Sequence, residues 1–397
     1  MSKHETKVIR IEEILPHPNA DRLALILVGG FQVVVRKDQF KTGDLAIYVE
    51  PDSIVPEMDA FSFVWEKDGG GNPNQHLEAG IPVPEKYRRV TVRRFRKEWS
   101  EGLLMSVFDF KDIWNANAPP GANLREGADV SELLGITHWN PPEEQEDRDP
   151  SVKQSKTMPR SLKGWFYFLK NWALHILTFG RYGWTQNLGD NEKAPKNTPG
   201  IYDVENYKKY KNVIQEGEQV VATEKIHGSN GRFLFQPQTL GPGRMFAGSR
   251  KLWKKEGSTT IWRKVLEYNP DIRRWCEDHP DYVLYGEVVP TQGGFDYGHK
   301  KETPWFYLFD IKDPLGDWVL YEDARQLTVG YDIEWVPLLH QGPFTSEVLK
   351  LADGKTKTGG THIREGVVIK VQPERHERNL GRVQLKVVSN AYLEKEQ

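Results

Sequence analysis

The sequence contains a single cysteine, Cys276, among its 397 residues. One thiol cannot form an intrachain disulfide or a cysteine-rich zinc site, and it suits a reducing cytoplasm, where we expect the protein to work. The formal net charge is only −2, so no overall basic field attracts nucleic acid. The single cysteine therefore excludes a secreted domain held together by disulfides. The low net charge means that any nucleic-acid-binding surface must be local.

Long apolar runs are also lacking. Residues 1–14 have no apolar core and do not resemble a signal peptide. The most apolar stretch, residues 165–179, is too short to span a bilayer and contains Lys170 and His175. We expect no membrane contact and interpret residues 160–184 as an aromatic amphipathic helix that packs against one of the domains.

Several common active-site motifs are missing. The chain has no His-Glu-x-x-His and no Cys-x-x-Cys. Gly354-Lys355-Thr356 resembles the end of a phosphate-binding P-loop, but Leu349 stands where that motif needs its first glycine. The segment 241–243 is followed by Phe246 where a dinucleotide-binding motif needs glycine. Zinc proteases, P-loop enzymes and dinucleotide-binding folds are therefore disfavoured.

The length suits two domains with a linker, and 38% hydrophobic with 28% charged residues is typical of globular proteins. We predict an α+β protein: a small N-terminal β-barrel over residues 1–136, a linker with the aromatic helix over 137–200, and an antiparallel-sheet domain over 201–397. Turn residues separate the short runs that predict the strands of the barrel: Lys7–Ile11, Leu25–Val28, Phe31–Val35, Leu45–Val49 and Val90–Val92.

Ionisable residues lie inside apolar, strand-like runs of the C-terminal half. The runs cover residues 220–230, 283–290, 305–311, 364–371 and 382–389. Strand side chains alternate between faces, so Glu287, Lys370 and Lys386 are predicted to point away from the apolar neighbours that form the core. A solvated outer face explains any one of these charges. Together they favour a shared cleft that binds a polyanion and a cation.

Six short motifs in these runs carry a resemblance. The segment Lys225–Asn230 resembles the nucleotidyl-transfer motif of the covalent nucleotidyltransferases, the superfamily of DNA ligases, RNA ligases and mRNA capping enzymes. Five more segments follow in the superfamily's order: Ser249–Lys251, Tyr285–Glu287, Phe306–Asp310, Glu365–Lys370 and Leu385-Lys386. The His-Gly-Ser-Asn and Phe-Asp sequences are most similar to those of nick-sealing RNA ligases.

The resemblance implies roles for particular residues. Lys225 would attack the α-phosphorus of ATP, which requires a neutral amine whose pKa neighbouring cations and desolvation would lower. Glu365 and Glu287 would hold Mg²⁺ or Mn²⁺. Phe309 would stack on adenine, and the lysines would bind phosphate. The full set of implied nucleotide contacts is Glu224, Asn230, Arg250, Glu287, Phe309, Lys370 and Lys386.

Two positions in the motifs leave questions open. His227 stands where many members of the superfamily have aspartate, and it is either a supporting group or incidental. Gln384 stands where phage-type relatives have a second lysine two residues before Lys386. Either one lysine suffices here or another cation, such as Lys251, replaces it.

The N-terminal half adds a second resemblance. Segments 16–23 and 43–49 are similar to the N-terminal OB-like domain of the Deinococcus-type RNA ligases. DNA ligases and capping enzymes have their OB domain after the transferase domain, so the order in this chain favours an RNA ligase. A basic segment in the same half is predicted to bind nucleic acid, or else to be a charged edge strand; its candidate contacts are Arg88, Arg89, Arg93, Arg94 and Arg96.

We therefore expect a monomeric ATP-dependent RNA ligase that joins 3′-hydroxyl and 5′-phosphate ends through lysyl-AMP and an adenylylated 5′ end. Its partner would be RNA or an RNA-containing nicked duplex. The alternatives are a DNA ligase, a GTP-dependent capping-type enzyme, and a non-catalytic RNA-binding protein with a degenerate transferase domain.

Overall fold

A computed structural model describes residues 5–66, 81–110, 112–113, 125–139, 190–195, 201–238, 241–291 and 294–395. The aromatic helix predicted within residues 160–184 lies outside this set. The elements that are described form mostly antiparallel sheets, with β12 (Glu205–Asn206) parallel to β23 (Gln384–Val388), and short helices, so the α+β prediction is confirmed.

The strands of the N-terminal region form two three-stranded sheets and two two-stranded pairs, of which β7–β8 is a hairpin and β6–β10 joins distant segments. One sheet has the order β1-β5-β9 and the other β2-β3-β4. Alternating apolar residues on these strands bury side chains such as Val8, Ile26, Val33 and Ile47 in two clusters. The strands are β1 (Lys7–Arg10), β2 (Ile14–Pro16), β3 (Leu23–Val28), β4 (Phe31–Arg36), β5 (Leu45–Val49), β6 (Ser53–Ile54), β7 (Arg93–Phe95), β8 (Glu98–Ser100), β9 (Leu103–Ser106) and β10 (Thr137–His138).

The strand predicted at Val90–Val92 is wrong. Val90 and Val92 are buried, but β7 begins only at Arg93. The Val90 N–H donates to the Ser53 carbonyl at 2.7 Å, and its carbonyl accepts from the Asp52 N–H at 2.8 Å. A loop thus buries the two valines and satisfies the Val90 backbone without a strand, which an apolar pattern alone cannot distinguish from a strand.

A five-stranded sheet of the C-terminal half has the order β12-β23-β20-β13-β19. Its strands are β12 (Glu205–Asn206), β13 (Gln219–Lys225), β19 (Leu338–Pro343), β20 (Gly366–Val371) and β23 (Gln384–Val388). The short pair β21 (His376–Glu377) and β22 (Gly381–Arg382) lies between β20 and β23 in the chain. One face carries a core that includes Ala222, Val367, Ile369, Leu385 and Val348 of α8 (Ser346–Lys350). The chain ends in α9 (Asn390–Lys395).

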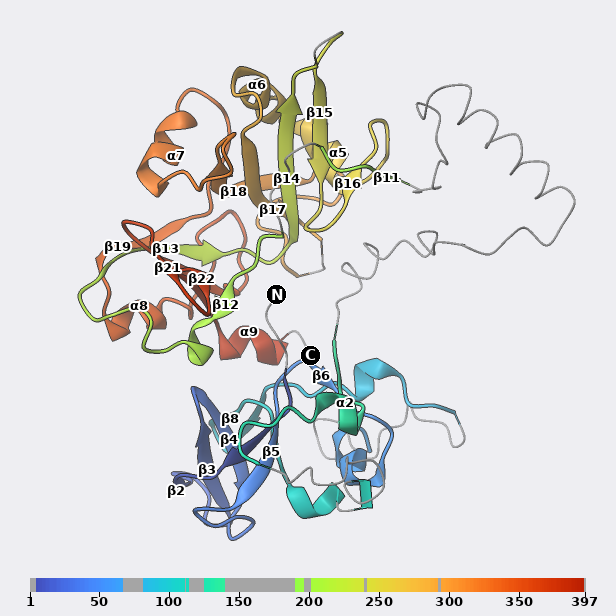
Figure 1. Ribbon diagram of the computed structural model, residues 1–397, viewed down its shortest axis with the longest axis vertical. Helices are drawn as coiled ribbons and strands as arrows, with labels where there is room; N and C mark the ends of the chain where they lie inside the picture. The colour runs from blue at the N-terminus through green and yellow to red at the C-terminus, as the bar shows by residue number, and fades with distance from the viewer. Residues whose placement is uncertain are drawn as a thin grey trace, which may run out of the picture. The chain divides into compact units, whose positions relative to one another are not determined.

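A six-stranded sheet has the order β11-β16-β15-β14-β17-β18. Its strands are β11 (Asn191–Glu192), β14 (Ser229–Gln236), β15 (Arg244–Gly248), β16 (Trp253–Lys254), β17 (Val283–Val289) and β18 (Trp305–Lys312). Helices α5 (Ile261–Tyr268) and α6 (Pro270–Asp278) contact this sheet (Figure 1). Their buried side chains include Trp262, Val265 and Trp275. Helix α7 (Tyr321–Leu327) contacts β18.

The chain forms two compact units that do not follow the sequence in order. Unit 1 contains Met1–Trp139, Asp203–Ile226 and Pro337–Gln397, and unit 2 contains Asn140–Tyr202 and His227–Val336. The five-stranded sheet therefore belongs to unit 1 with the N-terminal region, and the six-stranded sheet belongs to unit 2. The predicted division at residues 136 and 200 remains a prediction.

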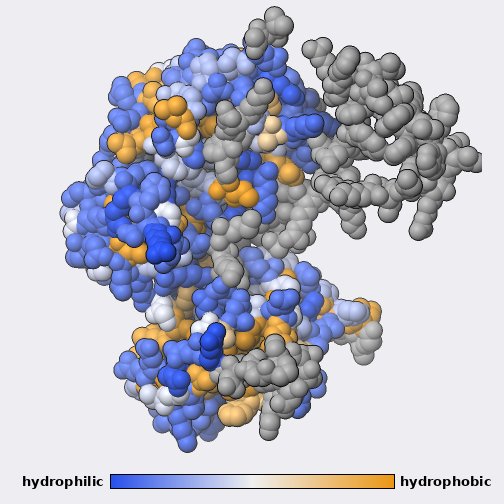
Figure 2. Space-filling view, viewed as in Figure 1, coloured by the Kyte–Doolittle hydropathy of each residue, from blue (hydrophilic) through white to orange (hydrophobic). Residues whose placement is uncertain are grey.

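The visible surface is mainly hydrophilic, with separate hydrophobic patches (Figure 2). The most exposed large hydrophobic side chains, those of Leu315, Phe108 and Val329, lie far apart in the sequence, as is usual for scattered surface residues. Within the described part of the chain, no helix has the length and apolar character to cross a membrane.

Candidate functional site

Strand register places three lysines on one face of the five-stranded sheet. Lys225 ends β13 and is opposite Gly366 of β20, while Lys370 is opposite Val221 and Lys386 is opposite Val368. Paired residues share a face and alternate residues return to it, so Lys225, Lys370 and Lys386 project to the same side. The apolar neighbours Val367, Ile369 and Leu385 fill the core on the other side, which confirms the predicted alternation.

Lys225 forms an ion pair with Glu365, which immediately precedes β20. The ammonium group bonds to Oε1 of Glu365. The other carboxylate oxygen, Oε2, is buried and has no hydrogen-bond partner among the described residues. A buried carboxylate oxygen of this kind is suited to binding a cation.

Gly366 allows this pair to form beside β23. A Cβ atom at position 366 would lie 2.1 Å from the Val387 carbonyl oxygen, far inside van der Waals contact. Because that obstacle is backbone, any side chain at position 366 would push β20 away from β23. The glycine that follows Glu365 in the motif is thus required by close strand packing.

Lys386 is desolvated and lies near both cationic and acidic side chains. Burial lowers the pKa of the Lys386 ammonium, and the charge of Lys225 lowers it further. Three carboxylates, those of Asp203, Glu365 and Glu205, act in the opposite direction. Burial also raises the pKa of Glu205, with Asp203 as a second cause. The net effect is a lysine that lacks full compensation for its charge, as expected of a group that binds an anion.

Gln384 is directly opposite Lys370 in the sheet. Its side-chain amide donates to the Asp203 carbonyl at 3.3 Å, and its oxygen accepts from Arg382 at 3.3 Å. A lysine at position 384 would set two ammonium groups side by side on adjacent strands, which destabilises a sheet. The glutamine that departs from the phage-type pattern therefore has a structural role here.

Glu224 points the opposite way from its neighbour Lys225. It is opposite Val367, on the core face, and its carboxylate is fully buried. Oε2 accepts a hydrogen bond from the Lys357 N–H at 2.8 Å and lies 3.7 Å from Nε of Arg364. Sequence reasoning missed Arg364, although an arginine at the start of an apolar strand-like run is an available signal.

In unit 2, Asn230 of β14 and Glu287 of β17 are directly opposite each other and share a face. The Glu287 Oε1 atom accepts from the Gly228 N–H at 3.2 Å. A Cβ atom at position 228 would lie 2.4 Å from the Val288 carbonyl oxygen, so only glycine permits this approach. The Oδ1 atom of Asn230 is buried and has no hydrogen-bond partner within the described residues.

Phe309 and Arg250 also belong to unit 2. The Phe309 ring lies 4.8 Å from that of Tyr202, in a cluster with Tyr285 and Trp318. The Tyr202 hydroxyl donates to Asp310 at 2.7 Å, which fixes its ring next to the Phe-Asp pair. Arg250 is half-buried, two residues beyond the end of β15, and Lys251 beside it is exposed.

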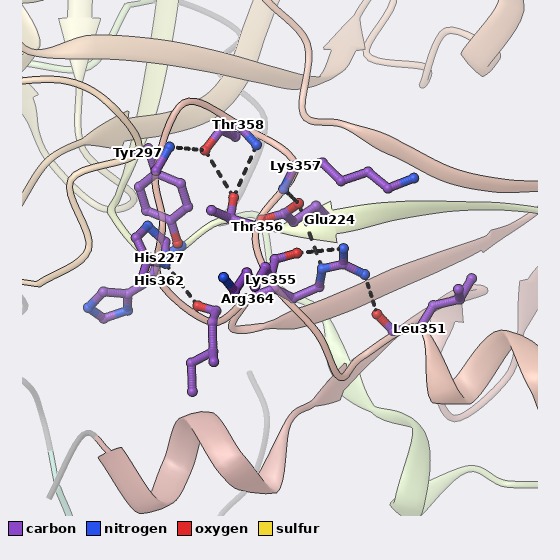
Figure 3. Close-up of polar contacts among 12 residues, drawn as sticks. Glu224, His227, Tyr297, Leu351, Lys355, Thr356, Lys357, Thr358, His362 and Arg364 are labelled. Atoms are coloured by element: carbon purple, nitrogen blue, oxygen red, sulfur yellow. Dashed lines mark hydrogen bonds and ion pairs between the residues drawn. The ribbon is translucent and has the colours of Figure 1, made fainter.

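Tyr297 supports the turn of the nucleotidyl-transfer motif. Its fully buried hydroxyl accepts a hydrogen bond from the His227 N–H at 2.6 Å (Figure 3). The Tyr297 backbone has a φ of 53°, in the left-handed region that ordinary residues rarely adopt. The His227 ring packs against Phe295 at 5.1 Å. Nothing in the local sequence marked Tyr297, because its partner lies 70 residues away.

The five arginines predicted to contact nucleic acid differ in their surroundings. Arg88 donates to the carbonyls of Val83 and Val55, and Arg89 binds Asp52 through two nitrogens, so both hold the fold together. Arg94 lies 4.0 Å above the Trp99 ring and pairs with Glu394.

Arg93 is partly buried, and its pKa is lowered by burial. Arg96 instead lies in the exposed turn between β7 and β8, beside exposed Lys97 and Phe95. Of the five predicted arginines, Arg96 is thus the one best placed to meet a large ligand.

Two family models match the chain. The model described as RNA ligase matches residues 218–388, and an OB-fold domain matches residues 6–107. The first range contains the three-lysine face, the Lys225–Glu365 pair and the Asn230–Glu287 pair. The N-terminal OB-fold prediction is thereby confirmed. A search of curated proteins finds no match.

Three solved structures of Naegleria gruberi RNA ligase share the fold. A variant with ATP and Mn gives a TM-score of 0.66 at 21% identity, covering 99% of each chain. The structure with PPi gives 0.64 at 23% identity, covering 99% of this chain and 98% of the other. Another variant with AMP and Mn gives 0.65 at 21% identity, covering 99% of each. The fold is therefore shared along the whole chain.

Proposed function

The chain carries an RNA ligase domain over residues 218–388 and an OB-fold domain over residues 6–107, and on this basis we propose that it is an ATP-dependent RNA ligase. The observation that carries the proposal is the ion pair of Lys225 with Glu365 on a sheet face that also bears Lys370 and Lys386. Three ammonium groups next to one carboxylate suit a triphosphate and its metal ion.

Lys225 is the proposed nucleophile. Its amine loses a proton, its lone pair attacks the α-phosphorus of ATP, and the bond to the bridging oxygen breaks as pyrophosphate leaves. An oxygen of a 5′-phosphate then attacks the phosphorus of the lysyl-AMP, and the P–N bond breaks to restore the Lys225 amine. A 3′-hydroxyl finally attacks the adenylylated 5′-phosphate and releases AMP. Lys370 and Lys386 would bind phosphate oxygens, where positioning and charge neutralisation supply most of the catalysis.

Glu365 is the proposed metal ligand in unit 1. A Mg²⁺ or Mn²⁺ ion would neutralise part of the triphosphate charge, and the free Oε2 atom of Glu365 fits it. No group of three or more His, Cys, Asp or Glu side chains in the described ranges could hold an ion by itself. That agrees with Mg²⁺, which usually takes one or two carboxylates and completes its shell with phosphate and water. Glu287 is the second predicted ligand.

The residues of unit 2 are proposed to bind the nucleoside. Phe309 offers an aromatic surface for adenine, while Glu287 can accept hydrogen bonds from ribose hydroxyls. The unsatisfied Oδ1 of Asn230 is suited to a donor on the ligand. Arg250 can bind ribose or phosphate oxygens through its planar fork of donors.

The remaining parts of the proposal concern the partner and setting. The substrate is RNA or an RNA-containing nicked duplex, which Arg96 and its neighbours in the OB-fold domain would contact. The enzyme would act as a monomer in a reducing cytoplasm, where Cys276, a free and buried thiol, stays reduced. DNA ligase and capping activities are disfavoured by the RNA ligase match and the N-terminal OB-fold. A non-catalytic role is disfavoured by the intact Lys225–Glu365 pair.

The test is incubation with labelled ATP and, separately, labelled GTP, followed by intact-mass measurement and peptide mapping. We expect ATP alone to add one AMP, on the peptide that contains Lys225, with release of pyrophosphate. The adenylylated protein should then seal a nick with a 3′-hydroxyl RNA end. Labelling by GTP, or AMP on a peptide without Lys225, would contradict the proposal.

A further inference from the structure

The segment Gly354–Arg364 forms a hairpin, hereafter the 354–364 hairpin, that leads directly into Glu365. An isolated bridge pairs Lys355 with Ile363. The Thr356 N–H donates to the His362 carbonyl at 3.1 Å, and the Arg364 N–H donates to the Gly354 carbonyl at 2.9 Å. The hairpin lies between the motifs Phe306–Asp310 and Glu365–Lys370, so the proposed chemistry does not use it.

Two buried charges hold the hairpin in place. The Arg364 guanidinium donates to the Leu351 carbonyl at 2.6 Å and the Lys355 carbonyl at 2.8 Å (Figure 3). Glu224 accepts from the Lys357 N–H on the other side. The side chains of Arg364 and Glu224 are only 7% and 0% exposed. Burying these groups is costly unless they are paired and hydrogen-bonded, so the hairpin shape is strongly specified.

The hairpin presents positive charge outward. Lys355 and Lys357 are exposed, whereas Thr356 between them is buried and bonds to the Thr358 hydroxyl at 2.9 Å. Residues 354–364 contain no Asp or Glu. Neither lysine forms an ion pair within 4.0 Å among the described residues, unlike nearby Lys350, which pairs with Glu347. In a chain of net charge −2, such a local concentration of cations provides a contact surface for an anion.

The residues that hold the hairpin are sequence neighbours of the proposed catalytic pair. Glu224 directly precedes Lys225, and Arg364 directly precedes Glu365. Lys225 is opposite Gly366 in the sheet, so the hairpin emerges at the end of the sheet where the Lys225–Glu365 pair lies. A chain that binds the hairpin is held close to that end of unit 1.

We propose that the 354–364 hairpin binds the phosphate backbone of the RNA substrate through Lys355 and Lys357. This inference rests on RNA being the substrate. The lysines of the sheet face differ from those of the hairpin: Lys370 is only 3% exposed, which suits a compact phosphate held in one position. Exposed lysines on a rigid support suit a long, hydrated polyanion, whose backbone contacts fix position without reading sequence.

The experiment compares Lys355→Ala/Lys357→Ala with wild type in binding to a labelled nicked RNA duplex at several salt concentrations. Removal of one lysine–phosphate interaction should reduce the slope of log affinity against log salt by roughly 0.9 on a duplex, so we expect a reduction of up to ~1.8. Binding at low salt should weaken by about tenfold or more, while lysyl-AMP formation stays at the wild-type rate. The hairpin should keep its shape because Arg364 and Glu224, which are unchanged, support it.

The matched control is Lys350→Ala/Arg378→Ala, which removes two exposed cations from the same unit and leaves the hairpin intact. It should bind RNA with the wild-type slope. Wild-type affinity and slope in the hairpin variant would overturn the inference. A raised KM for ATP in self-adenylylation, with RNA binding unchanged, would assign the hairpin to the nucleotide and also overturn it.

The binding measurement needs no adenylylation, so it is informative even if Lys225 is not the nucleophile. If the wild-type protein does not bind the nicked RNA, the proposed substrate is wrong and the hairpin inference fails with it.

Discussion

The two sheets of the C-terminal half differ in the chemistry that their polar residues offer. The five-stranded sheet of unit 1 presents three lysines and Glu365, with Lys225 and Glu365 ion-paired. The six-stranded sheet of unit 2 offers an amide, a carboxylate and an aromatic cluster, in Asn230, Glu287 and Phe309. Ammonium groups suit phosphates, whereas rings and hydrogen-bonding groups suit a nucleoside. Under the proposed function, phosphate chemistry and nucleoside recognition would therefore fall on separate sheets.

Lys225→Ala is the strongest test of the phosphate side. Without the amine no phosphoramidate bond can form, so adduct formation and sealing of unadenylylated ends should be abolished completely. Sealing of a pre-adenylylated nick should persist in part, because that step needs no lysyl-AMP. Labelling with ATP and intact mass measure the first effect, and gel assays measure the second. A Lys225→Ala protein that still labels would remove this residue from the mechanism.

Glu365→Ala should have the next largest effect. Removing one preorganised electrostatic interaction with a transition state typically costs about 100-fold or more in rate. We expect a decrease of at least ~100-fold in self-adenylylation, with partial rescue at raised Mg²⁺. Glu365→Gln is the control for shape, because it keeps the side-chain size and removes the charge; it should be nearly as impaired. Unchanged kinetics in both variants would exclude Glu365 from the site.

Phe309→Leu examines the nucleoside side. A base stacked on an aromatic side chain gains about 1–3 kcal/mol, so the KM for ATP should rise by roughly tenfold while the pre-adenylylated nick is sealed normally. Trp318→Leu is the matched control, since Trp318 belongs to the same cluster and has no predicted nucleotide contact. Equal effects of both changes on KM would mean that the cluster matters only for packing.

A smaller effect is expected from changes in the exposed turn of the OB-fold domain that contains Arg96 and Lys97. Arg96 and Lys97 have φ values of 48° and 78°, and asparagine tolerates this left-handed region, so Arg96→Asn/Lys97→Asn removes charge with little strain. The salt slope of RNA binding should fall by roughly 0.9 for each phosphate that the variant no longer neutralises. Arg89→Ala should instead lower Tm without changing the slope, because Arg89 binds Asp52. The reverse pattern would show that Arg89, and not the turn, contacts RNA.

The smallest expected effect is a change in stability, measured as Tm, in Lys386→Met. Because the pKa of Lys386 lies below its ordinary value of 10.5, the unfolded chain binds more protons in the interval between the two values. The cost to folding is complete below that interval and disappears as pH rises through it. Lys386→Met should therefore have a slightly higher Tm near neutral pH, with the difference shrinking toward alkaline pH.

The matched control for that change is Lys350→Met, an exposed lysine that should show no pH-dependent difference. Asp203 and Glu205, which favour the charged form of Lys386, keep the expected effect small. A Lys386→Met protein that is less stable than wild type at every pH would contradict it.

The alternation of side chains along a strand predicted which face of the sheet each residue occupies. It did not predict the residues that support the site from other segments of the chain. Alternation along β20 and β23 was enough to separate Lys370 and Lys386 from the core, because it depends on adjacent residues only. Arg364 and Tyr297 escaped prediction because their roles come from partners in other segments of the chain.

The basic segment of the OB-fold domain shows the same limit. Its pattern of charge cannot distinguish Arg89, which binds Asp52, from Arg96 in an exposed turn. The run predicted at 220–230 is in fact two strands, β13 and β14, separated at Ile226–Gly228, where Gly228 approaches Val288 and Glu287.

The path of the chain also constrains how the protein can be synthesised. Strand β13, which ends in Lys225, forms hydrogen bonds with β19 and β20, and these leave the ribosome more than a hundred residues later. The whole segment His227–Val336 of unit 2 is made in between. Pairings so distant in sequence form slowly and leave strand edges exposed while they wait. The strand that ends in Lys225 is thus unpaired on both sides until its two partner strands have been made, and the Lys225–Glu365 pair can form only after the whole of His227–Val336 has been synthesised.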